Sequence, residues 1–478
     1  MLTSRIAKFM LIGIVASLLA ISSALWAVDY ASDSDINDAI QRQISSDWGM
    51  RPNSIVVETN NGIVKLTGSV DNILASDRAI DIARTTKGVR SVINTMDINP
   101  IKRTDEEILK DITDAIVSDA VADHIDINVK VTDGVVTTSG TVDSFAESDL
   151  IERVVKGVKG VKKVENGIKN LDKSNRSDED IKADIEGRLK NDVLMSRALV
   201  NVSVNNGNVK LTGAIGTPKT RLRAKYNAEV TGTKSVNIDD LEVDWSRYDK
   251  MSDFEFSIHR SDPEIKSAIE DAFHYDPRVN PNNVGVYVKD HIVILTGNAT
   301  HLSSAQAAEN DAVDTFGVWQ VINRINVKSE PSIDDSALSD SILKALMRDP
   351  YLGNFHIKIA ILNGNVTLSG NVDSPFSKRH AGEVVLNIKG IVSINNKLEF
   401  ENQAKEIDSA IKDKIDYMLS WSPFVNSEKI NVDVKDGMVI LTGSVNSAYE
   451  NKTAETIAQD GGANTVVNVL KVIPPSEK

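Results

Sequence analysis

The sequence predicts an α+β protein of six tandem αββαβ units, each a three-stranded mixed sheet packed by two helices on one face. A seven-residue phrase, Gly-x-Val-x-Leu-Thr/Ser-Gly, returns six times, and successive copies are separated by 72, 73, 84, 73 and 73 residues. The same order of helical and alternating patterns surrounds each copy. A fixed period indicates one supersecondary unit repeated along the chain. The phrase begins at Gly62, Gly134, Gly207, His291, Gly364 and Gly437.

The first element of each unit is an amphipathic helix, because apolar residues recur at intervals of three and four. Its first apolar residue is Ile36, Ile108, Ile181, Ile265, Leu338 or Ile411. Capping boxes, in which a hydroxyl residue is followed three positions later by an acid, precede the first four helices. Asp334 is a simple cap in the fifth unit. The sixth has Ile407 there, so we expect its helix to begin a turn earlier, near Ala404.

An acidic residue follows eleven positions after the first apolar residue in five units. These residues are Asp47, Asp119, Asp192, Asp276 and Asp349, with Ser422 in the sixth unit. They stand one per unit, so none has a second carboxylate beside it in sequence. We interpret them as caps of the loop that ends the helix rather than as a catalytic or metal-binding set.

The repeated phrase lies in a β-hairpin, because both flanking segments alternate apolar and polar residues. Asn-Gly or Asp-Gly pairs join the two strands in five units, and both residues of such a pair tolerate the positive φ of a tight turn. The fourth unit has Asp290-His291 instead. We expect a wider or energetically costlier turn there.

A second helix and a last strand complete the unit. The helix closes on a glycine, which is typical of a left-handed C-cap. These glycines are Gly88, Gly160, Gly232, Gly317, Gly390 and Gly462. The last strand then returns as a crossover. Its recurring asparagines, interpreted as partners of the backbone rather than as ligands, are Asn94, Asn166, Asn323, Asn396 and Asn468.

This pattern resembles the BON domain family (bacterial OsmY and nodulation), whose members share the topology and the central Gly-x-Val-x-Leu-x-Gly hairpin. The resemblance covers residues 32–99, 104–172, 177–244, 261–328, 334–400 and 404–473, with a linker at 245–260 and a leader at 1–27. It implies a non-catalytic protein of the bacterial envelope, associated with osmotic stress and with binding to phospholipid surfaces or envelope proteins.

Composition narrows the possible functions. The chain has a formal charge of −14 and no cysteine. The acidic balance disfavours a nucleic-acid partner, and without cysteine there is no thiol nucleophile, disulfide or thiolate zinc site. No two of the 7 histidines stand at ligand spacing, and phosphate-loop and nucleophile-elbow patterns are absent. We therefore expect no catalytic residues, no metal and no cofactor; the oligomeric state stays open.

The N-terminus predicts export. Arg5 and Lys8 precede an apolar run over residues 9–20, and the small residues 22–24 form a plausible cleavage site, as in a secretory signal. The alternative is an uncleaved inner-membrane anchor over residues 9–28, which is just long enough to span a bilayer. Both readings place the six units outside the inner membrane, in the periplasm.

Two groups of residues are candidates for lipid or partner binding. The first is local basic charge, which either contacts an anionic lipid surface, where each lysine contributes about 1 kcal/mol, or is only the solvated face of a small domain. It comprises Lys156, Lys159, Lys162, Lys163, Arg221 and Arg223. The second is aromatic residues in the loop after the first helix, which could enter lipid headgroups or instead plug a thin core. It comprises Trp48, Tyr351, Trp421 and Phe424.

The leading functional hypothesis is an exported protein that binds anionic phospholipid surfaces or envelope protein clients during osmotic or envelope stress. The alternative is a non-catalytic spacer or scaffold that mediates protein–protein assembly in the periplasm.

Overall fold

The computed structural model describes residues 31–50, 53–171, 176–195, 198–245, 260–328, 333–400 and 407–473. The predicted leader and residues 246–259 of the predicted linker lie outside these ranges. Among the residues described, no helix is both long and apolar enough to cross a membrane.

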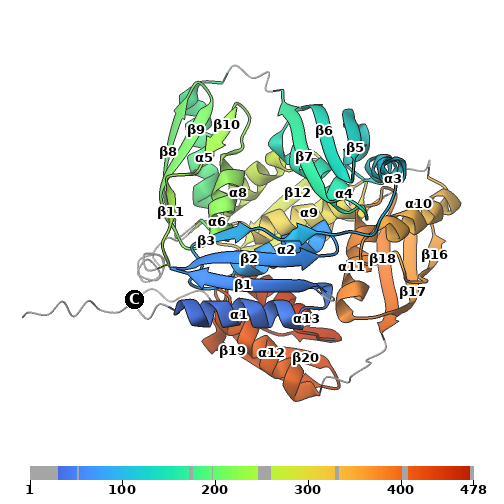
Figure 1. Cartoon of the computed structure of the whole chain (residues 1–478). Coiled ribbons are helices and arrows are strands. Elements are labelled where there is room, and N and C mark those ends of the chain that lie inside the picture. Colours follow the sequence, from blue (N-terminus) through green and yellow to red (C-terminus); the bar gives the residue numbers. More distant parts are fainter. Residues whose placement is uncertain are drawn as a thin grey trace, which may run out of the picture.

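Each unit contains a first helix, a hairpin, a second helix and a last strand, as predicted (Figure 1). Unit 1 comprises α1 (Asp33–Ser46), β1 (Ser54–Asn60), β2 (Ile63–Val70), α2 (Ile73–Arg84), β3 (Ser91–Asn94) and β4 (Asp97–Ile98). Unit 2 comprises α3 (Asp105–Ser118), β5 (Ile127–Thr132), β6 (Val135–Val142), α4 (Phe145–Lys156) and β7 (Lys163–Asn170). Unit 3 comprises α5 (Asp178–Asn191), β8 (Leu199–Asn205), β9 (Asn208–Ile215), α6 (Pro218–Ala228), β10 (Ser235–Asn237) and β11 (Leu241–Val243).

Units 4 to 6 repeat the same order. Unit 4 comprises α8 (Asp262–Tyr275), β12 (Val284–Lys289), β13 (Ile292–Ala299), α9 (Leu302–Val313), β14 (Gln320–Asn323) and β15 (Asn326–Val327). Unit 5 comprises α10 (Asp335–Arg348), β16 (Lys358–Leu362), β17 (Asn365–Val372), α11 (Pro375–Leu386) and β18 (Ser393–Phe400). Unit 6 comprises α12 (Asp408–Trp421), β19 (Ile430–Lys435), β20 (Met438–Val445), α13 (Ala448–Asp460), β21 (Thr465–Asn468) and β22 (Lys471–Val472).

The second strand is central in every sheet. It pairs antiparallel with the first strand and parallel with the last, which is continuous in units 2 and 5 and divided in the others. The recurring asparagines lie in the last strand and bind the backbone, which confirms the interpretation made from sequence. For example, Asn323 Oδ1 accepts from the N–H of Ile325, and Asn323 Nδ2 donates to the carbonyl of Ala305 in α9.

The first residue of each first helix is an aspartate that holds the hairpin turn. In unit 6 the carboxylate of Asp408 accepts from the N–H groups of Asp436 and Gly437, at 2.8 and 2.9 Å. Asp33, Asp105, Asp178, Asp262 and Asp335 make the same pair of bonds in the other units. This fixes one helix register for all six units. The expected start near Ala404 is therefore wrong: α12 begins at Asp408, with Ile407 as a cap that has no side-chain bond.

The turn of unit 4 is not wider than the others, but it is strained, which is the second of the two outcomes expected from sequence. Asp290 and His291 adopt φ of 51° and 61°, and Lys289 pairs with Ile292 as in a two-residue hairpin. A positive φ at a residue other than glycine is strained. The ring of His291 stacks on Trp319 at 4.2 Å between centroids, and its Nδ1 lies 3.0 Å from the carbonyl oxygen of Gly317. These contacts offset part of the strain.

Each unit has its own apolar core. In unit 1, Ile40, Val64 and Leu66 are fully buried between the sheet and the two helices. Some cores are completed by another unit: Trp421 of unit 6 packs against the core of unit 1, and Leu302 of unit 4 packs against that of unit 5. The units are thus separate domains with tight contacts between them.

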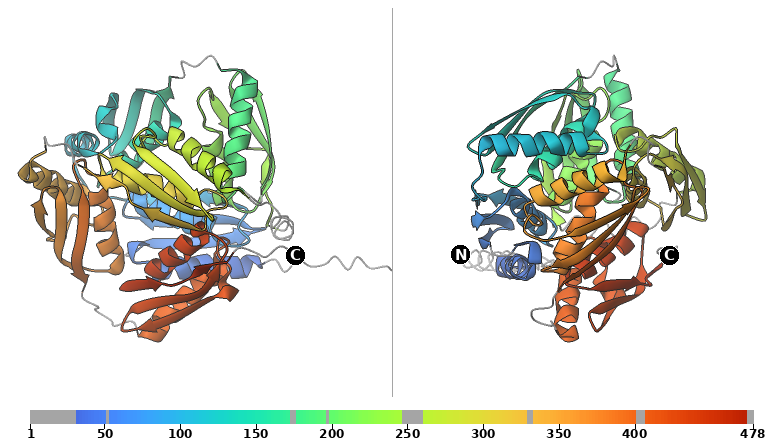
Figure 2. Two further views of the ribbon diagram at one scale, coloured as in Figure 1. Left: turned by 180° about the vertical axis from the view of Figure 1, so that it is seen from behind. Right: turned by 90° about the vertical axis from the view of Figure 1, so that its right-hand side faces the viewer.

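The six units do not form an open row. They pair in a nested order, first with last, and the sheets lie outside while the second helices face the centre (Figures 1 and 2). Units 2 and 5 join where Asp119 lies opposite Ile388, and units 3 and 4 where Asp192 lies opposite Thr315. Units 1 and 6 join through the N–H of Lys87, which donates to the carbonyl of Trp421 at 3.1 Å.

Every pair uses the same two surfaces. The loop after the first helix of one unit meets the end of the second helix of its partner. In units 2 and 5 the contact is reciprocal: Lys389 N–H donates to the Ser118 carbonyl at 3.0 Å, and Lys159 N–H donates to the Arg348 carbonyl at 2.8 Å. Repetition of one interface between repeated units closes the chain into a compact body.

Candidate functional site

A cavity of about 1350 Å³ lies at the centre of the closed arrangement. Residues from all six units line it, mostly from the second helices and from the loops after the first helices. Many of these residues are charged, and acids and bases are interspersed. Contacts between oppositely charged side chains of different units are therefore the main interactions at this site.

The five recurring aspartates cap their loops, which confirms the interpretation made from sequence, and Asp47, Asp276 and Asp349 also line the cavity. Asp349 Oδ1 accepts from the N–H groups of Tyr351 and Leu352, and Asp119 Oδ1 accepts from those of Val121 and Ala122. Asp47, Asp192 and Asp276 each accept from a nearby backbone N–H in the same way. Ser422 substitutes in unit 6, where its Oγ accepts from the N–H of Phe424.

In the odd-numbered units the capping aspartate also binds a cation located 31 residues later, on the second helix. The pairs are Asp47 with Arg78, Asp192 with Arg223, and Asp349 with His380. The aspartates are 8%, 3% and 4% exposed in their side chains, so these ion pairs are largely removed from water. We did not predict this pairing from the sequence, although the spacing of 31 residues is the same in all three units.

Those cations also connect the units. Arg78 of unit 1 and Arg379 of unit 5 both bind Asp460 of unit 6, and Arg223 of unit 3 binds Asp314 of unit 4 at 2.9 Å. Lys156 of unit 2 binds Asp77 of unit 1 at 3.0 Å. The cavity wall is therefore an ionic network that holds the units to one another.

Burial and neighbouring charges shift the pKa values of several side chains in the cavity wall. Burial tends to lower the pKa of His380, but its bonds to Asp349 and Glu383 outweigh that effect and raise the pKa to about 9. His380 is therefore charged at neutral pH. Burial and the neighbouring Asp276 raise the pKa of Asp311 well above its usual range, and burial raises that of Asp314.

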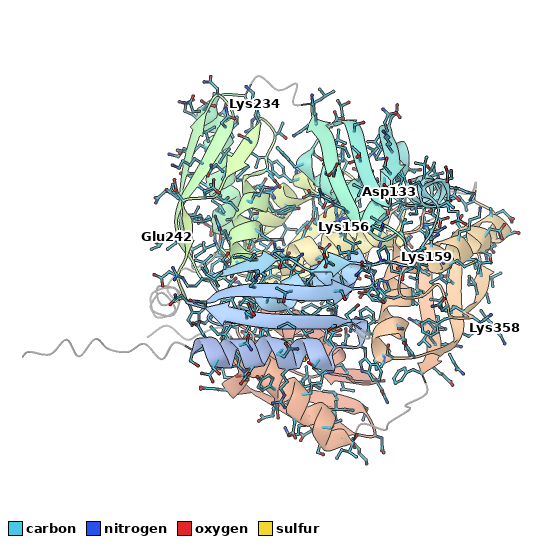
Figure 3. All side chains as sticks on the ribbon, in the orientation of Figure 1. Asp133, Lys156, Lys159, Lys234, Glu242 and Lys358 are labelled. Carbon is cyan, nitrogen blue, oxygen red and sulfur yellow. The ribbon has the colours of Figure 1, made fainter. Side chains whose placement is uncertain are left out.

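The ten candidate binding residues fall in different environments. Lys162 and Lys163 are exposed, and Lys159 is half-buried at the contact with unit 5. Lys156 faces unit 1 (Figure 3). Arg223 belongs to the ionic network, and Arg221 donates to the carbonyl of Ile238 within its own unit.

The four aromatic candidates make contacts inside the assembly. Trp421 packs against unit 1, and Phe424 contacts Tyr449 edge-on at 6.3 Å. Tyr351 packs edge-on against Phe376 and His380, and Trp48 is half-buried in a short 3₁₀ helix. The structure brings Phe424 to the cavity.

Comparison with known proteins supports the repeat pattern. The BON domain model matches residues 32–100, 104–170, 177–244, 261–329, 334–402 and 407–474. The chain belongs to the BON domain family. Each of the six BON units shows the predicted αββαβ order in the structure.

Two relatives match about the length of two BON units. Osmotically-inducible protein Y of Escherichia coli strain K12 is 30% identical over 148 residues, which are 30% of this chain and 74% of that protein. The 21 kDa hemolysin of Actinobacillus pleuropneumoniae is 24% identical over 146 residues, which are 30% of this chain and 75% of that protein.

A solved structure, the C-terminal domain of CdsD, a structural protein of the type III secretion system of Chlamydia trachomatis, is also similar. It is 16% identical and matches 45% of this chain and 100% of its own length. Its TM-score of 0.13 is too low to support a statement about function.

No metal centre or nucleophilic constellation is evident in the part of the chain that the structure describes. No cluster of three or more His, Cys, Asp or Glu side chains within the described ranges has the geometry to hold a metal ion. Asp47, Asp276 and Asp349 of the cavity instead accept from backbone N–H groups, and Asp314 and Asp460 bind arginines.

Proposed function

We propose that this protein is an exported, non-catalytic binding protein of the bacterial envelope that acts in osmotic or envelope stress. The leader pattern of residues 1–27 supports export to the periplasm, with anchoring by residues 9–28 as the alternative. The similarity to Osmotically-inducible protein Y supports the link to osmotic stress. The ion-paired cavity wall supports a binding role rather than a catalytic one.

We further propose that the protein contacts anionic phospholipid through unit 2. The observation that carries this proposal is the outer face of its sheet, where Lys130 of β5 and Lys163 and Lys169 of β7 are exposed. Glu165 is the acid among them and pairs with Lys163 at 2.8 Å. Lys162 adds an exposed cation at the end of the strand. This local surplus of positive charge favours an anionic surface despite the net charge of −14.

Reversal of two of these lysines should weaken binding to anionic vesicles. We expect Lys162→Glu/Lys163→Glu to lower the affinity at least about tenfold, because each lysine near an anionic surface contributes about 1 kcal/mol. The measurement is co-sedimentation with phosphatidylglycerol-containing vesicles at two salt concentrations. Lys156 is left unchanged because its reversal would break the ion pair with Asp77.

The matched control is Lys358→Glu/Lys397→Glu, which changes the net charge equally on the exposed sheet of unit 5. We expect this control to bind as the unmodified protein does. Equal loss in both variants, or binding that is insensitive to salt, would contradict the proposed lipid surface.

One observation favours a protein client as the second candidate function. On the outer face of unit 4, Tyr287, Ile294 and Ile322 are cross-strand neighbours, and Tyr287 is 55% exposed. The strands of this face lie at the front of the left view in Figure 2. The corresponding row in unit 2 is Lys130, Thr137 and Glu165. Absence of vesicle binding would favour this client surface, and the compact arrangement does not favour a spacer that reaches across the periplasm.

A further inference from the structure

Three arginines from three units meet at one side of the central cavity. Arg153 comes from α4 of unit 2, Arg278 from the loop after α8 of unit 4, and Arg348 from the end of α10 of unit 5. All three line a side pocket of about 190 Å³, and Arg153 and Arg278 also line the central cavity. The pocket is thus formed only when units 2, 4 and 5 are together.

Arg153 is an unusual cation in this wall. It forms no ion pair and no hydrogen bond with any residue that the structure describes, whereas Arg78 and Arg223 each bind two carboxylates. Burial and the nearby charge of Arg278 lower its pKa. The residue is nevertheless exposed, and it lines both the central cavity and the side pocket. Arg153 therefore has donors that face the cavity and no acceptor from the described chain.

The other two arginines retain donors as well. Arg278 donates from Nε and Nη2 to Asp276, which leaves Nη1 without an acceptor among the described residues. Arg348 is 8% exposed, and its Nη2 donates to Ser118 Oγ at 3.0 Å, with no ion pair to a described carboxylate. Of the three, Arg348 is the buried guanidinium without a carboxylate partner among the described residues. Such a group is costly, so its presence calls for an acceptor.

The two carboxylates of the side pocket, those of Asp119 and Asp349, are not free to serve as acceptors for these arginines. Asp119 already accepts from Val121 and Ala122, and burial raises its pKa. Asp349 accepts from Tyr351 and Leu352 and binds His380, which is itself charged. Asp276 balances Arg278, and His380 balances Asp349. Arg153 and Arg348 therefore face Asp119 without an ion pair, and the pocket keeps a positive surplus.

We propose that this three-arginine pocket binds a small oxyanion, a phosphate ester or a carboxylate-bearing solute. The planar fork of arginine matches the oxygens of both groups, and charge-assisted hydrogen bonds of this kind are the strong ones. The site is independent of the lysine-rich face of unit 2, because it lies between units and faces the interior.

The test uses the full chain and inorganic phosphate as the probe, in isothermal titration calorimetry at constant ionic strength with chloride as the balancing salt. We expect saturable binding that Arg153→Gln weakens at least about tenfold, as for loss of a hydrogen bond to a charged group. Arg324→Gln, which removes an exposed arginine of unit 4, should leave it unchanged. Absence of phosphate binding beyond the chloride control, or equal loss in both variants, would overturn the proposal.

A second readout separates a binding arginine from a structural one. Because Arg153 has no partner and is repelled by Arg278, Arg153→Gln should leave the Tm without phosphate unchanged or raise it. A lowered Tm would assign a structural role and contradict the proposal.

Parallel titrations with glycerol phosphate and with anionic vesicles distinguish the sources of the anion. If the ligand is a free solute, Arg153→Gln should weaken the binding of glycerol phosphate and of inorganic phosphate alike. The binding of anionic vesicles should then be unchanged. Loss of vesicle binding instead would assign the anion to a lipid headgroup and overturn the assignment to a free solute. The results for phosphate and glycerol phosphate do not depend on whether the lysine reversals on unit 2 weaken vesicle binding.

Discussion

Arg223→Ala is expected to lower the free energy of unfolding by about 3–5 kcal/mol, as for the loss of one partner from a buried ion pair. Arg223 binds Asp192 of its own unit and Asp314 of unit 4. Asp192 is only 3% exposed in its side chain, so the substitution leaves a buried carboxylate without its cation. The effect should appear as loss of contact between units 3 and 4, and it is measured by urea unfolding at neutral pH.

Two variants make this result specific. Lys234→Ala removes an exposed cation of the same unit and should change stability by less than about 0.5 kcal/mol. Arg223→Lys should recover only part of the loss, because one ammonium group does not reproduce the planar fork that binds two carboxylates. If Arg223→Ala were as mild as Lys234→Ala, the ionic network would not hold the units together.

Gly213→Ala should destabilise unit 3 by on the order of 3 kcal/mol, because it combines backbone strain with overlap. Gly213 ends the repeated phrase and has a φ of 121°, a conformation that L side chains rarely adopt. A methyl group there would overlap the carbonyl oxygen of Leu199 on the neighbouring strand β8. A backbone carbonyl at or just before the start of the neighbouring strand crowds Gly68, Gly297 and Gly443 in the same way, which explains why the phrase ends in glycine.

Gly187→Ala is the matched control in the same unit. Gly187 lies within α5, and a methyl group there would meet nothing within 4 Å. Alanine in a helix interior is favoured over glycine by up to about 1 kcal/mol, so this variant should be stabilised. The measurement is the Tm of both variants and of the unmodified chain in thermal unfolding. A Gly213→Ala protein as stable as the unmodified chain would contradict the packing role of this glycine.

The fold of one unit was predictable because its signals are local. Helix caps and the Asn-Gly turns each determine the conformation of a few neighbouring residues, and six copies reinforced one another. The glycines predicted as C-caps of the second helices do have positive φ, but in five units they lie three residues beyond the C-cap, in the turn before the last strand. The error at Ala404 and the strained turn at His291 both arose where a cap or turn residue differed from the other copies. In both places contacts from elsewhere in the unit, with Asp408 and with Trp319, maintain the common geometry.

The arrangement of the units was not predictable in the same way. Pairing of units 1 and 6 depends on contacts such as Arg78 with Asp460, which are 382 residues apart and follow no repeat period. Arg223 appeared in the sequence as part of a basic surface cluster, whereas it lies in the cavity wall. Its place was signalled by its position 31 residues after Asp192, which matches that of Arg78 after Asp47.

Formation of a disulfide between units 2 and 5 tests the nested closure most directly. The chain has no cysteine, so Ser118→Cys/Lys389→Cys introduces a single possible pair at positions joined by a 3.0 Å backbone hydrogen bond. Closure predicts rapid intramolecular cross-linking of the monomer under mild oxidation, read as a mass loss of about 2 Da on forming one S–S bond. A pair of cysteines at Ser118 and the exposed Lys435 of unit 6 should not cross-link. Equal cross-linking of the two pairs, or none in either, would contradict the closed six-unit arrangement.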